Sequence, residues 1–238
     1  MLAGITKTER IIERFGHQIV SGEYAPGSAL PSENELCIEF DTSRNIIREA
    51  VKVLSAKRLI DAQRHRGLFV MPRDGWNYLD SDVLRWALEE GGNDKTLIAA
   101  LNDVRGVVEP AIGRWAAERA TAMDLAQIEL ALNEMEKHAS GGDKDAFNEA
   151  DIRFHKAVLL AAHNPVMLQL ADAISALQRA IFDRTFLNSE VQIHSTLEQH
   201  KDLFEAIRYQ DATAAEAASL IMIRRTARRM LERDQTKS

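Results

Sequence analysis

Three residues in the second half of the chain, Asp151, His155 and His200, are of types that bind metal ions. Asp151 and His155 are four positions apart, so on a helix their side chains project from the same face. A carboxylate and an imidazole at this spacing suit two ligands of one divalent ion, and His200 is a third candidate on a separate stretch. Two alternatives remain open: Asp151 could pair with Arg153 or Lys156 on the surface, and His155 could be an ordinary core histidine.

A second group of residues, near the N-terminus, is suited to reading DNA. Arg44 and Arg48 are four residues apart, with Asn45 alongside, at the start of a helix expected over 43–57. Arginine pairs bidentately with guanine and asparagine with adenine, and the first residues of a recognition helix lie nearest the base edges. The alternative is a charged face that only contacts water.

The elements that position these arginines follow from apolar spacing and capping signals. The apolar residues of 8–20 recur at helical intervals, Ser32 and Glu35 form a capping box for a short second helix, and Ser43 can cap the third. Residues 61–70 are predicted to form a small hairpin. Its tip consists of Arg64, His65, Arg66 and Gly67 and could reach phosphates or a minor groove.

Beyond a breaker-rich stretch at 72–78, helical periodicity continues to the C-terminus. Helices are expected near 81–90, 94–119, 122–140, 144–162, 165–186, 192–209 and 211–233. The sequence therefore predicts a mainly α fold. A winged helix-turn-helix of three helices plus a small β-hairpin would occupy 1–73, a linker 74–80, and an all-α bundle of six or seven helices 81–238.

Composition narrows the function classes. The single cysteine, Cys37, excludes an internal disulfide framework and any multi-cysteine metal site. The net charge is −6, yet residues 1–73 hold 11 Lys and Arg against 9 Asp and Glu, which places any DNA-binding surface at the front. The opening residues lack a signal-peptide pattern, and no apolar run reaches the roughly 18 residues of a membrane span. We expect a cytoplasmic protein with no membrane partner.

The first 70 residues resemble the winged-helix domain of the GntR family of bacterial regulators. The segments that carry this resemblance are 19–36, 42–51 and 66–70, and the match covers about 8–72. The resemblance implies double-stranded operator DNA as partner, with contacts from Ser43, Arg44, Asn45 and Arg48, and secondary contacts from Asn34, His65, Arg66 and Gly67. His65 stands where the family usually has glycine, which leaves the path of the wing tip open.

The segments 147–155, 162–165 and 198–207 look like the FCD effector domain of the FadR-type branch of that family, over about 80–235. In this branch an aspartate and three histidines hold a divalent metal, often zinc or nickel, below a pocket for a carboxylate. Asp151, His155 and His200 match three of these positions, and the fourth is Met222. A thioether is a poor ligand for such an ion, so the metal is held by three protein ligands, weakened or absent.

The effector would also need a cationic anchor, and arginine holds a carboxylate bidentately. The resemblance places a pocket arginine at Arg105, for which a surface salt bridge is the alternative. Arg229 is a second candidate, in a basic stretch that could simply be solvated. Phe186 and Thr196 are expected as an apolar wall and a hydroxyl donor, and Met222 would border the same pocket.

Three further segments, 76–86, 108–112 and 114–121, are similar to the members of the family that control galactonate catabolism. This similarity implies a homodimeric repressor that a sugar acid, galactonate, releases from its operator. Three rivals remain: a regulator of another carboxylate such as a hexuronate, lactate or a fatty acyl derivative; a metal-dependent enzyme using Asp151, His155 and His200 on a small acid; and a helical module that binds another protein.

Overall fold

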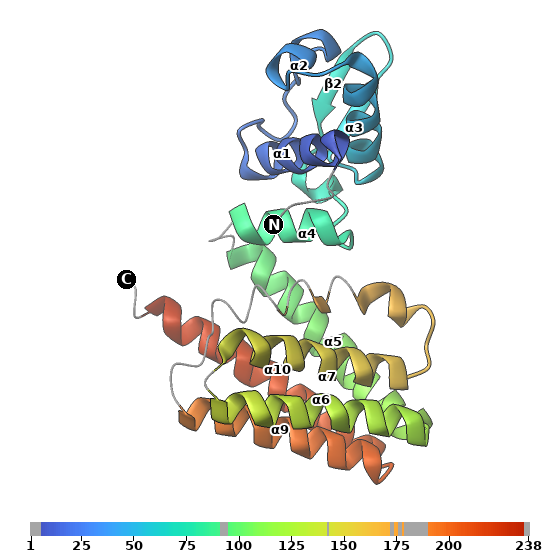
Figure 1. Cartoon of the computed structure of the whole chain (residues 1–238), viewed down its shortest axis with the longest axis vertical. Coiled ribbons are helices and arrows are strands. Elements are labelled where there is room, and N and C mark those ends of the chain that lie inside the picture. The colour runs from blue at the N-terminus through green and yellow to red at the C-terminus, as the bar shows by residue number, and fades with distance from the viewer. Residues whose placement is uncertain are drawn as a thin grey trace. The chain divides into compact units, whose positions relative to one another are not determined.

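The structure, a computed structural model, describes residues 6–90, 95–141, 143–171, 174, 175, 178 and 190–235. Its internal contacts group the chain into two compact units, unit 1 over residues 1–94 and unit 2 over residues 95–238. Figure 1 shows α1, α2, α3 and β2 together in unit 1 with α4 beneath them, and a helical bundle in unit 2. The predicted fold, a winged helix-turn-helix followed by an all-helical part, is confirmed.

Unit 1 begins with a three-helix core whose ends are defined by local capping. The helices are α1 (Lys7–Ser21), α2 (Glu33–Glu39) and α3 (Arg44–Ala56). The capping box predicted at Ser32 and Glu35 is present at the start of α2, and Thr6 with Glu9 forms another before α1. The apolar faces of the helices meet in a core that includes Phe15, Leu36, Ile47 and Leu54.

The wing is a two-stranded antiparallel hairpin made of β1 (Ile60–Gln63) and β2 (Gly67–Val70). Gln63 pairs with Gly67, so the three residues between them form the tip. His65 has a φ of 65°, in the left-handed region that glycine adopts without strain. A glycine, which the resemblance to the family leads us to expect here, would adopt this φ without strain. Gly67, with a φ of 101°, then returns the chain to the sheet.

Helix α4 (Ser81–Glu90) follows the short turn η1 (Arg73–Gly75) and packs against α1. Trp86 is fully buried on Gly16, and its indole N–H donates to Glu13 at 2.9 Å. Arg85 binds both oxygens of the same carboxylate, which lowers the pKa of Glu13 to about 2. The sequence pattern predicts that residues 81–90 belong to the rear bundle, whereas the contacts in the structure group α4 with unit 1.

Unit 2 is a bundle in which α5 packs on α7 and α10, and α6 lies against α7 and α9. In Figure 1 α6, α7 and α9 run alongside one another. The elements are α5 (Lys95–Arg119), α6 (Ala122–Gly141), α7 (Lys144–Ala161), η2 (Met167–Leu170), α9 (Glu190–Arg208) and α10 (Ala212–Gln235). The helix expected over 165–186 starts instead with the 3-10 turn η2, because the Asn164 carboxamide accepts from the amides of Val166 and Met167.

None of the helices that the structure describes is both long and apolar enough to cross a membrane. The core of unit 2 consists of side chains from α5, α6, α7, α9 and α10, among them Phe147, Phe154, Leu203 and Phe204. Four of these helices, α5, α7, α9 and α10, also supply the polar residues of the site described next.

Candidate functional site

The N-terminal end of α3 presents the predicted DNA-binding side chains to solvent. Ser43, Arg44, Asn45 and Arg48 are all exposed, while the opposite face of α3 is buried. Ser43 occupies the N-cap position, but its hydroxyl makes no capping hydrogen bond with the described residues. The donors of this helix end are therefore available to an anion such as a phosphate.

Arg48 is held in place by a neighbouring acid. Its Nε donates to Glu33 Oε2 at 2.9 Å, with the arginine side chain 62% exposed. An exposed pair of this kind contributes about 0–1 kcal/mol, so it orients the guanidinium without preventing it from binding a stronger partner. On α2 the predicted Asn34 is also exposed, beside Glu33.

The wing exposes the whole predicted tip, Arg64, His65, Arg66 and Gly67. The guanidinium of Arg66 lies over the ring of Phe69, with its Cζ 5.7 Å from the centroid. Such a cation–π contact is compatible with a salt bridge at the guanidinium edge. The tip therefore carries two cationic side chains and one imidazole on a rigid two-stranded support.

In unit 2, helices α7 and α9 bring Asp151, His155 and His200 together. Their ligand atoms all lie within 4.8 Å of one another. His200 Nε2 is 2.8 Å and His155 Nε2 is 3.9 Å from the same oxygen, Asp151 Oδ1. Arg153, which the sequence offered as a surface partner of Asp151, binds Glu134 instead. The three residue types and their separations suit one divalent ion.

The hydrogen bonding of His200 supports this fit. Its Nδ1 lies 2.8 Å from the backbone carbonyl of Thr196, which can only accept, so Nδ1 carries a proton. Its Nε2 is buried, has no hydrogen bond of good geometry with the described residues, and faces a carboxylate oxygen. An imidazole whose Nδ1–H is held by a carbonyl, leaving the Nε2 lone pair free, is the usual state of a metal-binding histidine.

The charge states of the other two members agree with a cation site. Burial raises the pKa of Asp151, but the neighbouring His200, His155 and Arg105 outweigh burial and lower it. The carboxylate is therefore ionised. Burial also lowers the pKa of His155, although Asp151 and Glu109 oppose that shift, so the imidazole is neutral at pH 7. An ionised carboxylate and a neutral imidazole are the ligand forms that a metal requires.

Arg105 on α5 is buried, with 4% of its surface exposed, and forms an ion pair inside the protein rather than on its surface. Its Nε donates to Glu109 Oε1 at 2.5 Å and its Nη2 lies 3.4 Å from Glu109 Oε2. Its Nη1 is buried without a hydrogen-bond partner among the described residues. Glu109 in turn lies 3.8 Å from His155. Glu109 is not among the site residues predicted from the sequence, although its position four residues after Arg105 is the spacing of a helical ion pair.

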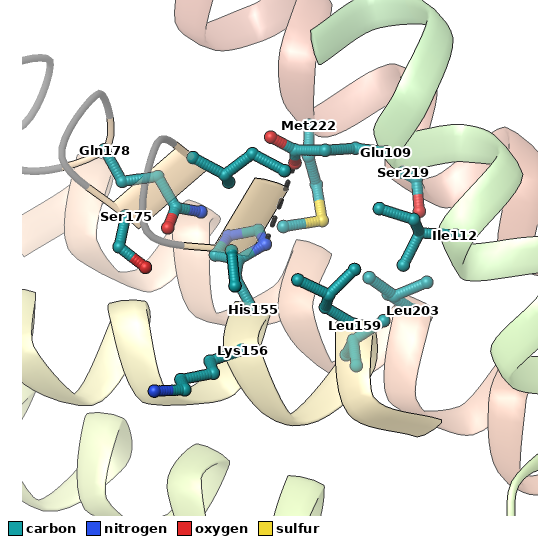
Figure 2. A pocket seen from close by; sticks show the side chains of 13 residues that line it. Glu109, Ile112, His155, Lys156, Leu159, Ser175, Gln178, Leu203, Ser219 and Met222 are labelled. Carbon is teal, nitrogen blue, oxygen red and sulfur yellow. Dashed lines mark ion pairs between the residues drawn. The ribbon is translucent and has the colours of Figure 1, made fainter. Parts of the chain in front are cut away.

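A pocket opens beside this cluster, with about 450 Å³ of empty space that includes some open to solvent. Figure 2 shows His155, Glu109 and Met222 bordering the same space, so Met222 lies at the pocket as expected. The remaining lining residues are Ile112, Lys156, Val158, Leu159, Ala171, Ile174, Ser175, Gln178, Leu203 and Ser219. The pocket thus has a polar end at Glu109 and His155 and a long apolar wall.

The other predicted effector residues fare differently. Thr196 is not among the residues that line the pocket, and its hydroxyl donates to the carbonyl of Gln192. It contributes to the site through its backbone carbonyl, which accepts from His200 Nδ1. Phe186 and the side chain of Arg229 fall outside the described residues. The sequence analysis also missed Gln178, a buried amide on the pocket wall, because one glutamine in a helix has no distinctive pattern.

Comparison with known proteins gives consistent matches. Residues 7–70 match the description "Bacterial regulatory proteins, gntR family" and residues 100–225 match the FCD domain. The chain is 59% identical over 228 residues to the galactonate operon transcriptional repressor of Escherichia coli (strain K12), covering 96% of this chain and 98% of that protein. It is 26% identical to the Uxu operon transcriptional regulator of the same strain, over 90% of this chain and 82% of that protein. The solved structure of Streptococcus agalactiae GntR is 26% identical in sequence and has a TM-score of 0.52. The match covers 93% of this chain and 99% of that one.

Proposed function

Because the chain belongs to the GntR family of bacterial regulatory proteins and carries its FCD domain, we propose that it represses a galactonate catabolic operon and is released by galactonate. Unit 1 binds the operator and unit 2 binds the acid, in the bacterial cytoplasm. The observation that carries the proposal is the buried cluster of Arg105, Asp151, His155 and His200 beside a pocket, in a chain so similar to a galactonate repressor.

The DNA-binding role rests on α3 and the wing. Arg44, Asn45 and Arg48 are exposed at the end of α3 that a recognition helix directs at base edges. Arg48 exchanges its exposed partner Glu33 for guanine or phosphate, and Ser43 adds a hydroxyl for the backbone. The wing tip, with Arg64 and Arg66, binds neighbouring phosphates or the minor groove.

The protein acts as a homodimer on a near-palindromic operator. A two-fold dimer places two copies of α3 about one helical turn of DNA apart, roughly 34 Å. Each head contributes its own arginines, and the two together provide the affinity that a single short helix lacks.

The charges of the effector site favour a bound divalent cation. Arg105 and Glu109 neutralise each other, so Asp151 leaves the inner cluster, which excludes the exposed Lys156 on the pocket rim, with a net charge of −1 when both histidines are neutral. A carboxylate would be repelled by that site. Asp151, His155 and His200 would hold a zinc or nickel ion, which would reverse the sign of this charge and supply a Lewis-acid anchor for the acid. Arg105 would add a hydrogen bond from Nη1, which has no partner among the described residues.

Release from DNA requires differential binding. Galactonate changes the DNA affinity only if it binds the DNA-incompetent arrangement of the dimer more tightly. A nearly complete switch needs a preference of about 5.5 kcal/mol. By the same linkage, operator DNA weakens galactonate binding by the factor by which galactonate weakens DNA binding.

A mobility-shift titration tests the proposal. The protein is titrated on the promoter region of its own gene at fixed salt, with galactonate, a hexuronate or lactate, and with or without chelator. We expect a specific complex that galactonate dissociates and that chelator makes insensitive to galactonate. A complex that only the hexuronate or lactate dissociates would reassign the effector, and the absence of any specific complex would refute the repressor role.

A further inference from the structure

We propose that Gln178 reads the hydroxyl groups of the bound acid, so that the pocket selects polyhydroxylated acids over simple carboxylates. This inference rests on the proposed function, because it assumes that the pocket beside His155 holds the acid. It goes beyond that function by naming the residue that distinguishes the acid's polyol chain from an alkyl chain.

Gln178 is buried, and its amide has no hydrogen-bond partner in the part of the chain that the structure describes. Only 5% of its surface is exposed, and neither Nε2 nor Oε1 has a hydrogen bond with the described residues. A buried amide without partners is destabilising, and such groups in native proteins are usually satisfied by water or a ligand. Its side chain lines the pocket, and Figure 2 shows the amide pointing toward the space that His155 also borders.

The chemistry of this side chain matches a hydroxyl group. A carboxamide both donates and accepts, as does each hydroxyl, so one glutamine can bind one or two neighbouring hydroxyls of a sugar acid. Ser175 lies one turn earlier and lines the same wall with a further hydroxyl. His155 marks the end of the pocket next to the candidate metal ligands, where the proposed function places the carboxylate. The neutral Gln178 and Ser175 then face the remainder of the acid.

This arrangement discriminates through the pairing of buried groups. An acid with an alkyl or acyl chain would leave the amide of Gln178 unpaired in a pocket from which it has displaced water. Sites built to hydrogen-bond a substrate hydroxyl reject analogues that lack it far more strongly than apolar pockets reject a missing methylene. The long apolar wall of Ile112, Leu159 and Leu203 limits the width of the ligand, while Gln178 sets its polarity.

The test compares Gln178→Leu with the wild type and with Gln169→Leu, a control at an exposed glutamine of η2. Calorimetry on the full, metal-loaded chain measures the dissociation constants of D-galactonate and of lactate, which has no hydroxyl beyond its second carbon. We expect Gln178→Leu to weaken galactonate binding about tenfold or more, to change lactate binding less than about twofold, and to leave the control unchanged.

Thermal unfolding without ligand separates this role from a structural one. Because the amide makes no hydrogen bond to any described residue, replacing it with leucine should leave the melting temperature unchanged or raise it, whereas loss of a structural hydrogen bond would lower it. Galactonate affinity of Gln178→Leu within twofold of the wild type, or equal weakening for lactate, would overturn the assignment. A wild type that binds neither acid would instead refute the proposed function on which the assignment rests.

Discussion

Removing the metal should weaken galactonate binding by about two orders of magnitude. The site carries a net charge of −1 from Asp151 without a metal and +1 with a divalent ion, because Arg105 and Glu109 cancel. At a separation of roughly 6 Å and an effective dielectric constant near 20, one pair of unit charges is worth about 3 kcal/mol. Adding the metal replaces repulsion of the carboxylate by attraction, so the electrostatic part of the binding free energy changes by about 6 kcal/mol before screening.

Solvent and salt reduce this difference, since the pocket is partly open. If roughly half survives screening, the effect is about 3 kcal/mol, which is about 100-fold in the dissociation constant. Calorimetry with galactonate on chelator-treated protein, before and after reloading with zinc or nickel, measures it directly. Mass spectrometry of the metal content confirms each state.

The isosteric variant Asp151→Asn sharpens the test, because it removes a metal ligand and a negative charge together. The metal-free variant should bind galactonate more tightly than metal-free wild type, yet adding metal should not restore full affinity. Equal galactonate affinity in chelated and reloaded wild type would show that the acid is not bound through a metal, and the charge argument would be wrong.

Four other changes have definite expected outcomes. Arg48→Ala should reduce specific operator affinity about 10- to 100-fold in a mobility shift, because a groove-facing guanidinium is lost. Arg105→Ala should give a repressor that binds DNA but that galactonate no longer releases, measured in the same assay. Unit 1 should lose about 1 kcal/mol of stability as the pH falls from 4.5 toward 2, since protonation of Glu13, whose folded pKa is about 2, breaks its partly exposed pair with arginine. The Glu13→Gln variant should lack this acid-dependent loss in a thermal melt. Gly16→Ala should lower the melting temperature, because the added methyl would meet the Trp86 ring at 2.4 Å.

Matched controls keep these outcomes specific. Arg114→Ala removes an equally charged but exposed side chain of α5 and should leave operator affinity unchanged. The sign of the pH effect follows from the lowered pKa of Glu13. The ion pair of Glu13 stabilises unit 1 fully above the pKa of the unfolded chain, near 4.5, and this contribution is lost as the folded carboxylate is protonated near pH 2. Stability that rose on acidification, or an unchanged operator shift with Arg48→Ala, would contradict the respective assignments.

Local signals in the sequence were enough for the elements of the fold. The capping box at Ser32 and Glu35 and the apolar periodicity of α1 and α3 predicted helices that the structure has. The hairpin around Arg64 and Arg66 followed from turn chemistry. These features depend on residues within a few positions of each other, so a linear pattern contains the information that specifies them. The placement of α4 did not follow, because a buried tryptophan on Gly16 is a contact between distant segments.

For the site, the sequence by itself determined which residue types were present and which of them shared a helix, as with Asp151 and His155. Only the tertiary structure decided that His200 of α9 meets them, that Arg105 is buried against Glu109, and that the amide of Gln178 faces the pocket with no hydrogen bond to the described residues. The physical reason is that convergence of α5, α7, α9 and α10 depends on how their apolar faces pack, which no spacing along one helix encodes.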